Sequence, residues 1–192
     1  MTYLIFGLFI FLGAHSVRLV AEDWRTQTRS RLGVLPWKGL YSVVSVFGLG
    51  LLIWGFGLAR QQPVALWTPP LAMRHLASLL TLISFVLLAA AYVPGNSIKA
   101  RLHHPMVLAV KIWALAHLLS NGNLAHVVLF GSFLGWSIWD YSAARRRDQA
   151  AGTRYPGGTA GATGIAEAMG VGAWIAVTLW LHGQLIGVRP LG

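Results

Sequence analysis

The sequence predicts an all-α protein: a membrane helix bundle of about six transmembrane helices, with both termini on the outer side of the membrane. Three observations lead to this fold class. The 192 residues are 56% hydrophobic and only 10% charged, whereas a soluble domain carries roughly 25% charged residues. Apolar runs recur at close to the roughly twenty residues that cross the hydrocarbon. Basic residues gather between these runs.

Apolar stretches define the expected transmembrane helices in order. The first follows no basic region and ends in no small-residue cleavage site, so we expect a retained span rather than a signal peptide. Glycines recur along the second, where they let helices approach closely. Pro-Gly-Asn at 94–96 ends the third, and a turn at 121–123 separates the fourth from the fifth. The expected spans are residues 2–20, 39–59, 73–93, 105–120, 124–141 and 169–187.

The segments between the spans are polar, proline-rich or basic. The longest, residues 143–168, is rich in Gly and Ala, so we expect a flexible cytoplasmic loop there. No internal repeat is evident, and we interpret residues 1–192 as a single transmembrane domain.

The distribution of basic residues orients the bundle. With the N-terminus outside, the segments after spans one, three and five face the cytoplasm and hold most of the Lys and Arg residues, which is the positive-inside pattern. We therefore expect a multi-pass membrane protein with both termini outside. The inner residues are Arg25, Arg29, Arg31, Lys38, Lys99, Arg101, Arg145, Arg146, Arg147 and Arg154, and the outer ones are Arg60, Arg74 and Arg189.

The composition excludes several function classes. The chain has no Cys, which removes disulfides, iron–sulfur clusters, thiolate ligation of haem and covalent haem attachment. Membrane topology explains the net charge of +10 better than nucleic acid does. We therefore expect the lipid bilayer, and no nucleic acid, as a partner. The sequence contains no hydrolase triad, P-loop or GxGxxG motif.

Seven histidines stand beside only five acidic residues, and imidazole is a common ligand of haem iron. A histidine at a helix end is usually an interfacial polar group, which is our interpretation of His75, His103 and His182 taken alone. His15 and His117 lie deeper in their spans, where a polar side chain is costly, and this favours a ligand role. Judged by depth, His117 also pairs with His75, His126 or His182.

Three motifs carry a resemblance to a known family. AHS at residues 14–16, HHP at residues 103–105 and KIWALAHLLSNG at residues 111–122 together resemble the NnrU family of integral membrane proteins. This family is related to the plant and cyanobacterial 15-cis-ζ-carotene isomerase. The resemblance covers roughly residues 3–142, and its specificity comes from the combination, because each piece alone is weak.

The resemblance implies a non-covalent haem b held by two axial histidines, which match His15 and His117. The histidine of the HP motif matches His104, a secondary candidate. The isomerase has a further histidine before its second loop, where this chain has Ala59 or Arg60, so that feature is absent. The resemblance also implies a multi-pass protein of the bacterial inner (cytoplasmic) membrane with a role in nitrite and nitric oxide reduction. Its partner is then a redox or denitrification protein or a lipophilic small molecule.

Three further residues are expected to complete the cofactor site, of which Lys111 shares a helix face with His104 rather than with His117. Lys111 either pairs with a haem propionate or extends to the inner interface. Trp113 and Asn121 lie one turn before and one turn after His117 on the same helix face. Asn121 either orients the imidazole or belongs to the turn that follows.

Three function classes follow from these patterns. The first, which we favour, is a bis-histidine haem b protein with a redox or sensing role in denitrification. The second is a haem-dependent cis–trans isomerase of a lipophilic polyene such as ζ-carotene, so the sequence leaves open whether the chain is an enzyme. The third is a haem-free membrane transporter or assembly factor.

Overall fold

The computed structural model describes residues 1–191, and its regular structure over that range is helical. Strand-like pairing in these residues is limited to two isolated bridges, Ala65 with Asn123 and Asn96 with Thr159. The all-α class predicted from the sequence is therefore confirmed. By its internal contacts the chain divides into two compact units, Met1–Leu66 with Asn123–Ser132, and Trp67–Gly122 with the residues from Phe133 onward.

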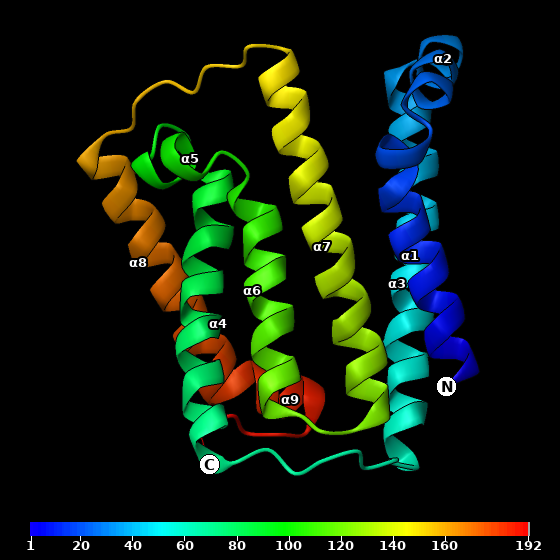
Figure 1. Cartoon of the computed structure of the whole chain (residues 1–192), viewed down its shortest axis with the longest axis vertical. Helices are drawn as coiled ribbons and strands as arrows, with labels where there is room; N and C mark the ends of the chain where they lie inside the picture. The colour runs from blue at the N-terminus through cyan, green and yellow to red at the C-terminus, as the bar shows by residue number, and fades with distance from the viewer. Residues whose placement is uncertain (192) are drawn as a thin grey trace. The chain divides into compact units, whose positions relative to one another are not determined.

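The first unit contains two long apolar helices with a short polar helix between them. Its helices are α1 (Thr2–Val20), α2 (Glu22–Leu32), α3 (Val34–Gln61) and the start of α7 (Leu124–Ala150) (Figure 1). The indole rings of Trp24 in α2 and Trp37 in α3 meet edge to face, with centroids 5.9 Å apart. The backbone N–H of Leu124 donates to the carbonyl oxygen of Val64 at 2.9 Å, so the first residue of α7 is fixed to the segment after α3.

Glycines bring α1 and α3 into direct backbone contact. A β-carbon on Gly7 would overlap the backbone of Leu52, and one on Gly55 would overlap the backbone of Leu4, which is fully buried. Close approach at small residues is typical of membrane helix pairs, because packing rather than the hydrophobic effect holds helices together in lipid. Of the glycines in the second predicted span, Gly48 and Gly55 therefore form the contact surface for the first.

The second unit is organised around one helix that packs against two others. Its helices are α4 (Leu71–Tyr92), α5 (Ser97–Leu102), α6 (Pro105–Ser120), the remainder of α7, α8 (Ala160–Ala176), the π-helix η1 (Val177–Leu181) and α9 (His182–Ile186) (Figure 1). The last three follow one another without a break, as a single helical segment over 160–186.

Hydrogen bonds between side chains and neighbouring helices fix α4 against α6 and α8. The buried hydroxyl of Ser84 in α4 donates to the carbonyl oxygen of Ala109 in α6 at 2.8 Å. On the other side, the indole N–H of Trp174 in α8 donates to the hydroxyl of Thr81 at 3.1 Å. Such bonds are worth about 0.6 kcal/mol on average in membrane helix bundles, so they fix the register of the helices more than they stabilise the fold.

The corner between α4 and α5 is held by one buried side chain. Asn96 is 1% exposed, and its amide nitrogen donates to the carbonyl oxygens of Ala90 at 2.8 Å and Val93 at 2.6 Å. Its amide oxygen accepts the N–H of Lys99 at 2.7 Å, which caps α5. Because every polar atom of this amide has a partner, its burial is compensated.

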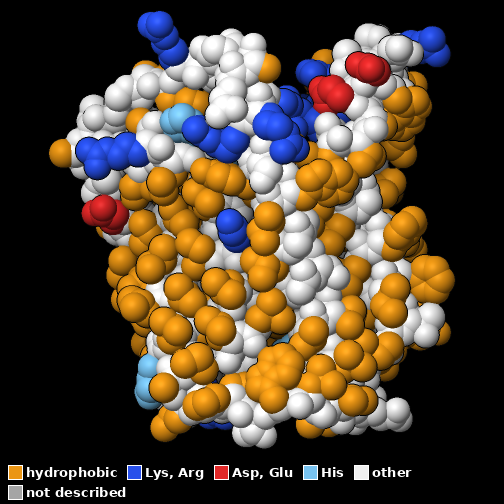
Figure 2. Space-filling model, in the orientation of Figure 1, with side chains coloured by type: hydrophobic (Ala, Val, Ile, Leu, Met, Phe, Trp, Pro, Cys, Tyr) orange, Lys and Arg blue, Asp and Glu red, His pale blue; other side chains and the backbone are white. Residues whose placement is uncertain are grey.

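Four helices are long and apolar enough to cross a bilayer, namely Thr2–Val20, Val34–Gln61, Leu71–Tyr92 and Ala160–Ile186. They correspond to the first, second, third and sixth predicted spans. The chain therefore has the character of an integral membrane protein. Helix α6 begins and ends where the fourth predicted span does, but its 16 residues are fewer than the roughly twenty needed for a full crossing. Within the second unit, Figure 2 shows hydrophobic side chains along the helices and most of the visible Lys and Arg side chains near the end that bears α5.

The expected loop over 143–168 is wrong at both ends. Helix α7 continues to Ala150, and α8 begins at Ala160, so only residues 151–159 lack helix. Alanine and arginine are strong helix formers, and their run carries α7 past the fifth predicted span. At the other end, the hydroxyl of Thr159 accepts the N–H of Ala162 at 3.2 Å and caps α8.

Two glycines of α3 provide a matched test of the α1–α3 contact. We expect Gly55→Ala to lower the free energy of unfolding in detergent by about 1–3 kcal/mol, because the added methyl group has no space against α1. Gly57 has open space around its β-carbon position, so Gly57→Ala is expected to be neutral or stabilising by up to about 1 kcal/mol. Equal effects of the two substitutions on unfolding in a dodecyl maltoside–SDS titration would contradict the close contact.

Candidate functional site

His15 lies in the second half of α1, in the first unit. Its Nδ1 is 2.7 Å from the carbonyl oxygen of Phe11, one turn earlier. Because a carbonyl oxygen only accepts, Nδ1 carries the proton and donates. The imidazole is partly buried and lies against the ring of Phe11, with centroids 4.3 Å apart, and against the ring of Tyr41 of α3 at 5.4 Å.

His117 lies in the last turn of α6, in the second unit, and repeats this local geometry. Its Nδ1 donates to the carbonyl oxygen of Trp113 at 2.8 Å, again one turn earlier. The indole of Trp113 lies 5.1 Å from the imidazole centroid and meets the ring of Phe133 edge to face at 5.6 Å.

The shared hydrogen bond assigns the chemistry of both rings. A neutral imidazole has one N–H donor and one lone-pair nitrogen. With Nδ1 donating to the backbone in each case, Nε2 of His15 and Nε2 of His117 carry the lone pair. A hydrogen bond at the other ring nitrogen also orients the ring and raises its basicity, as in most metal-bound histidines. Both side chains therefore meet the local requirement for an iron ligand at Nε2.

The other candidates around His117 take more ordinary roles. The amide nitrogen of Asn121 donates to the backbone carbonyl of His117 at 2.9 Å, so Asn121 completes the end of α6, and the imidazole is oriented by the Trp113 carbonyl. Lys111 is partly exposed on α6, and within residues 1–191 its ammonium makes no hydrogen bond or ion pair.

The three alternative ligands lie in different surroundings. His75 is exposed near the start of α4. His182 is partly exposed, and its Nδ1 donates to the carbonyl oxygen of Val188 at 2.6 Å. His126, at the start of α7, packs its ring edge to face against Phe56 with centroids 5.2 Å apart, and its buried Nδ1 has no hydrogen-bond partner in the described residues.

His104 belongs to a cluster at the end of the second unit that bears α5. It precedes the first residue of α6, and its Nε2 donates to a carboxylate oxygen of Asp148 at 2.8 Å. The hydroxyl of Tyr155 donates to the same oxygen at 2.9 Å. The carboxylate thus joins three segments, the α5–α6 junction, the end of α7 and the connection to α8.

His103 and Arg145 extend this cluster. The ring of His103 stacks on Tyr155 with centroids 4.1 Å apart and an interplanar angle of 14°, and its Nδ1 contacts the guanidinium of Arg145. The backbone of His103 has φ 69°, a region that non-glycine residues seldom adopt. This conformation reverses the chain between α5 and α6 and turns two adjacent imidazoles toward Asp148.

The cluster favours a charged carboxylate. Partial burial acts to raise the pKa of Asp148, but the hydrogen bonds from Tyr155 and His104 and the charges of the two histidines outweigh burial and lower that pKa. Burial and the neighbouring carboxylate raise the pKa of Tyr155. Tyr155 therefore stays a donor and Asp148 an acceptor at neutral pH, so the cluster fastens the α7–α8 connection to the bundle.

The structure brings some predicted site residues together and leaves others apart. It joins Trp113, His117 and Asn121 at one end of α6, whereas His104 lies at the opposite end with Nε2 bound to Asp148. Sequence reasoning missed Asp148 and Tyr155. Each was a detectable signal, since one is the only acidic residue and the other the only aromatic residue between positions 143 and 164.

Within residues 1–191, no group of three or more His, Cys, Asp or Glu side chains gathers as a metal site. A haem iron with two imidazole ligands does not require such a group.

Comparison with known proteins identifies one family. A family model described as NnrU protein matches residues 3–190, which is nearly the whole chain and extends beyond the region of the sequence resemblance. No curated protein matches the chain, and no solved structure does.

Asp148→Asn tests the cluster. We expect it to lower the free energy of unfolding at pH 7 by about 1–3 kcal/mol, because the substitution removes the charge that strengthens two hydrogen bonds. Since folding lowers the pKa of Asp148, the stabilisation is present above the unfolded-state pKa of about 3.9 and is lost as the pH falls through the folded-state value. Thermal unfolding of the wild type and the variant between pH 7 and pH 3 checks this.

The control is Asp23→Asn, which alters an exposed carboxylate of α2. It should leave stability within about 0.5 kcal/mol. A difference between wild type and Asp148→Asn that grows toward acid pH would contradict the assigned role.

Proposed function

Because the chain belongs to the NnrU family, we propose that it is an integral membrane protein that binds haem b through His15 and His117. We propose further that it supports nitrite and nitric oxide reduction through a redox or sensing role. One observation carries the ligand assignment. Both imidazoles donate Nδ1–H to the carbonyl one turn earlier, at 2.7 and 2.8 Å, and so present the lone pair at Nε2.

A hydrogen bond to its own helix fixes each histidine ring before a ligand binds. An imidazole tied to its own helix loses little rotational freedom on binding, which favours affinity. When bound, haem b supplies one-electron chemistry. Two protein ligands leave no open coordination position, which suits electron transfer or sensing better than turnover of a substrate.

Neighbouring residues would contribute to the same cofactor. The indole of Trp113 lies against His117 and excludes water from one side of the imidazole. The ammonium of Lys111, which lacks a partner within residues 1–191, would pair with a propionate, and this pairing would offset the cost of a cation within the membrane. We place the chain as a multi-pass protein in the bacterial inner membrane, with both termini outside and a redox or denitrification protein as partner.

Single histidine substitutions test the ligand assignment. We expect His15→Ala and His117→Ala, each made alone, to lower haem retention severalfold or to change a low-spin spectrum to a high-spin one. His75→Ala is the control, because that histidine is exposed and should leave the spectrum unchanged. Reduced-minus-oxidised absorbance spectra of the purified proteins, with added imidazole as a rescue of His117→Gly, make the comparison.

The spectra also separate the function classes. If both histidine variants keep the wild-type spectrum, the ligand assignment is wrong even though the chain belongs to the family. If the wild-type protein is colourless and stays so after hemin is added, the haem-free transporter or assembly factor remains.

A second candidate, a haem-dependent cis–trans isomerase of a lipophilic polyene, is favoured by a groove in the first unit. The groove has a volume of about 330 Å³, and its lining includes Leu8 and Leu12 of α1 and Ser16, which follows His15. A slender apolar molecule fits such a lining. The histidine expected of the isomerase near Ala59 is absent, although the imidazole of His126 packs on Phe56, one turn before that position.

Gly13 offers a way to fill this groove. It lines the groove and has open space around its β-carbon position, so Gly13→Phe should block a polyene while leaving the fold intact. If the second candidate is right, the haem-loaded wild-type protein isomerises added cis-ζ-carotene, as measured by chromatography. The rate with Gly13→Phe is then at least about tenfold lower. If the wild-type protein does not isomerise the carotenoid, the isomerase candidate is contradicted and the redox or sensing role is retained.

A further inference from the structure

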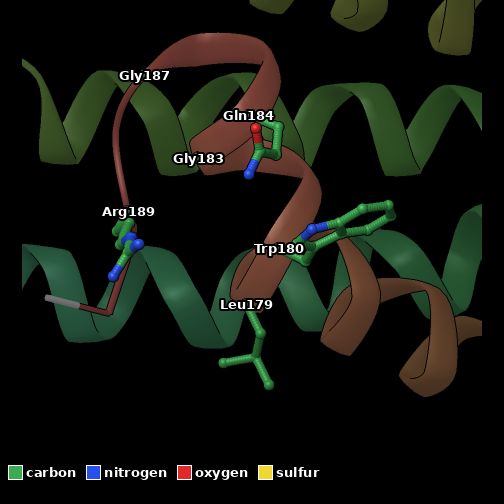
Figure 3. A pocket seen from close by; sticks show the side chains of 6 residues that line it. All are labelled: Leu179, Trp180, Gly183, Gln184, Gly187 and Arg189. Carbon is green, nitrogen blue, oxygen red and sulfur yellow. The ribbon is translucent and has the colours of Figure 1, made fainter.

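A small polar cavity lies at the end of the second unit that bears α9. Its volume is about 150 Å³, and it is lined by Trp180 of η1, Gln184 of α9 and Arg189 of the segment that follows, together with Gly183 and Gly187 (Figure 3). This cavity shares no residue with the histidine sites, so an inference from it is independent of haem binding.

The polar side chains of the cavity are mainly hydrogen-bond donors. Figure 3 shows the indole nitrogen of Trp180 and the amide nitrogen of Gln184 turned toward the space beside Arg189. An indole and a guanidinium donate and never accept. None of the lining residues is acidic, and within residues 1–191 Arg189 forms no ion pair or hydrogen bond. Among the described residues, the cavity therefore presents a positive charge with no acidic partner, together with convergent donors.

The local backbone explains why these side chains meet. Helix α9 ends at Gly187, whose φ of 76° reverses the chain and whose N–H donates to the carbonyl oxygen of Gly183 at 3.0 Å. The returning segment is held by the bond from His182 Nδ1 to the carbonyl oxygen of Val188 at 2.6 Å. The aliphatic part of Arg189 then passes over Gly183, where a β-carbon would lie 3.5 Å from its Cγ.

The surroundings indicate where in the membrane the cavity lies. Beside the donors, Leu179 is 66% and Leu185 is 76% exposed, so apolar side chains flank a cationic niche. Trp180 itself is largely exposed, and tryptophan is enriched at the boundary between hydrocarbon and headgroups. A phospholipid meets both requirements, because it carries its anionic group at that depth and its acyl chains beside it.

We propose that this cavity binds a phosphate group, held by the guanidinium of Arg189 and the N–H groups of Gln184 and Trp180. Guanidinium matches the geometry of phosphate with two parallel hydrogen bonds. The same chemistry admits two sources, the headgroup of an anionic phospholipid and inorganic phosphate. The apolar flank favours the phospholipid.

Titration calorimetry of the full chain in detergent micelles distinguishes the two sources. The probes are dihexanoyl phosphatidylglycerol and sodium phosphate. We expect Arg189→Gln to raise the Kd for the bound probe about tenfold, since a charge-assisted hydrogen-bonded pair is lost. Gln184→Glu should raise it similarly by repulsion, and Trp180→Phe, which keeps the ring and removes the N–H, should raise it about threefold.

Arg154→Gln is the matched control, because it removes an exposed arginine of the connection between α7 and α8. It should leave the Kd within twofold. Tight binding of the phosphatidylglycerol alone supports the headgroup as ligand, and binding of both probes supports a site for free phosphate as well. The proposal is overturned if neither probe binds to the wild type. It is also overturned if Arg189→Gln, like the control Arg154→Gln, binds the probe with the Kd of the wild type.

Discussion

The bilayer offers polar side chains no water, so each polar group within a membrane helix must find its partner in protein. In this chain, several of them find it one turn back in the same helix. The hydroxyls of Ser16, Ser120 and Ser132 donate to the carbonyls of Leu12, Ala116 and Val128 at 2.7, 3.0 and 2.7 Å. The same bond forms at Nδ1 of His15 and His117. A serine uses its only donor this way, whereas a neutral imidazole that donates Nδ1–H has a second nitrogen, Nε2, that carries a lone pair.

Because these hydrogen bonds form within single helices, the packing between helices depends on small residues and on a few hydrogen bonds between helices. Glycines of α1 and α3 bring two backbones together, and α4 is fixed to its neighbours through Ser84 and Trp174. Because lipid supplies no hydrophobic force between helices, these contacts set the arrangement within each unit. The carbonyls that orient the histidines belong to the same helices that these contacts fix, so the fold and the candidate ligand geometry have a common origin.

Local sequence signals predicted the helices well. Helices α1 and α6 occupy the residues that hydropathy, Pro105 and the turn after Ser120 indicate, because apolar composition and helix-terminal residues act locally. The extension of α7 was missed, since its arginines were assigned to the cytoplasmic loop after residue 141 rather than counted as helix formers. The motif resemblance suggested His104 as a secondary ligand, and only the fold reveals that its Nε2 is bound to Asp148, which lies 44 residues away in the sequence.

The two ends of the second unit have different chemistry. At the end that bears α5, the charged carboxylate of Asp148 accepts hydrogen bonds from an imidazole and a phenol, so the donors of this cluster already have an acceptor. At the end that bears α9, Arg189 and its neighbouring donors face a cavity with no acidic lining residue. A satisfied network stabilises a fold, whereas an unsatisfied set of donors is available to a ligand. This distinction, rather than the number of charged residues, separates the structural cluster from the candidate binding site.

The most direct test of the account is the near-infrared magnetic circular dichroism spectrum of the oxidised, haem-loaded wild-type protein, because this spectrum identifies the pair of axial ligands. If Nε2 atoms of two histidines hold the iron, the spectrum carries the low-spin charge-transfer band of a bis-imidazole complex. A band characteristic of imidazole with an amine or with water would contradict the central claim.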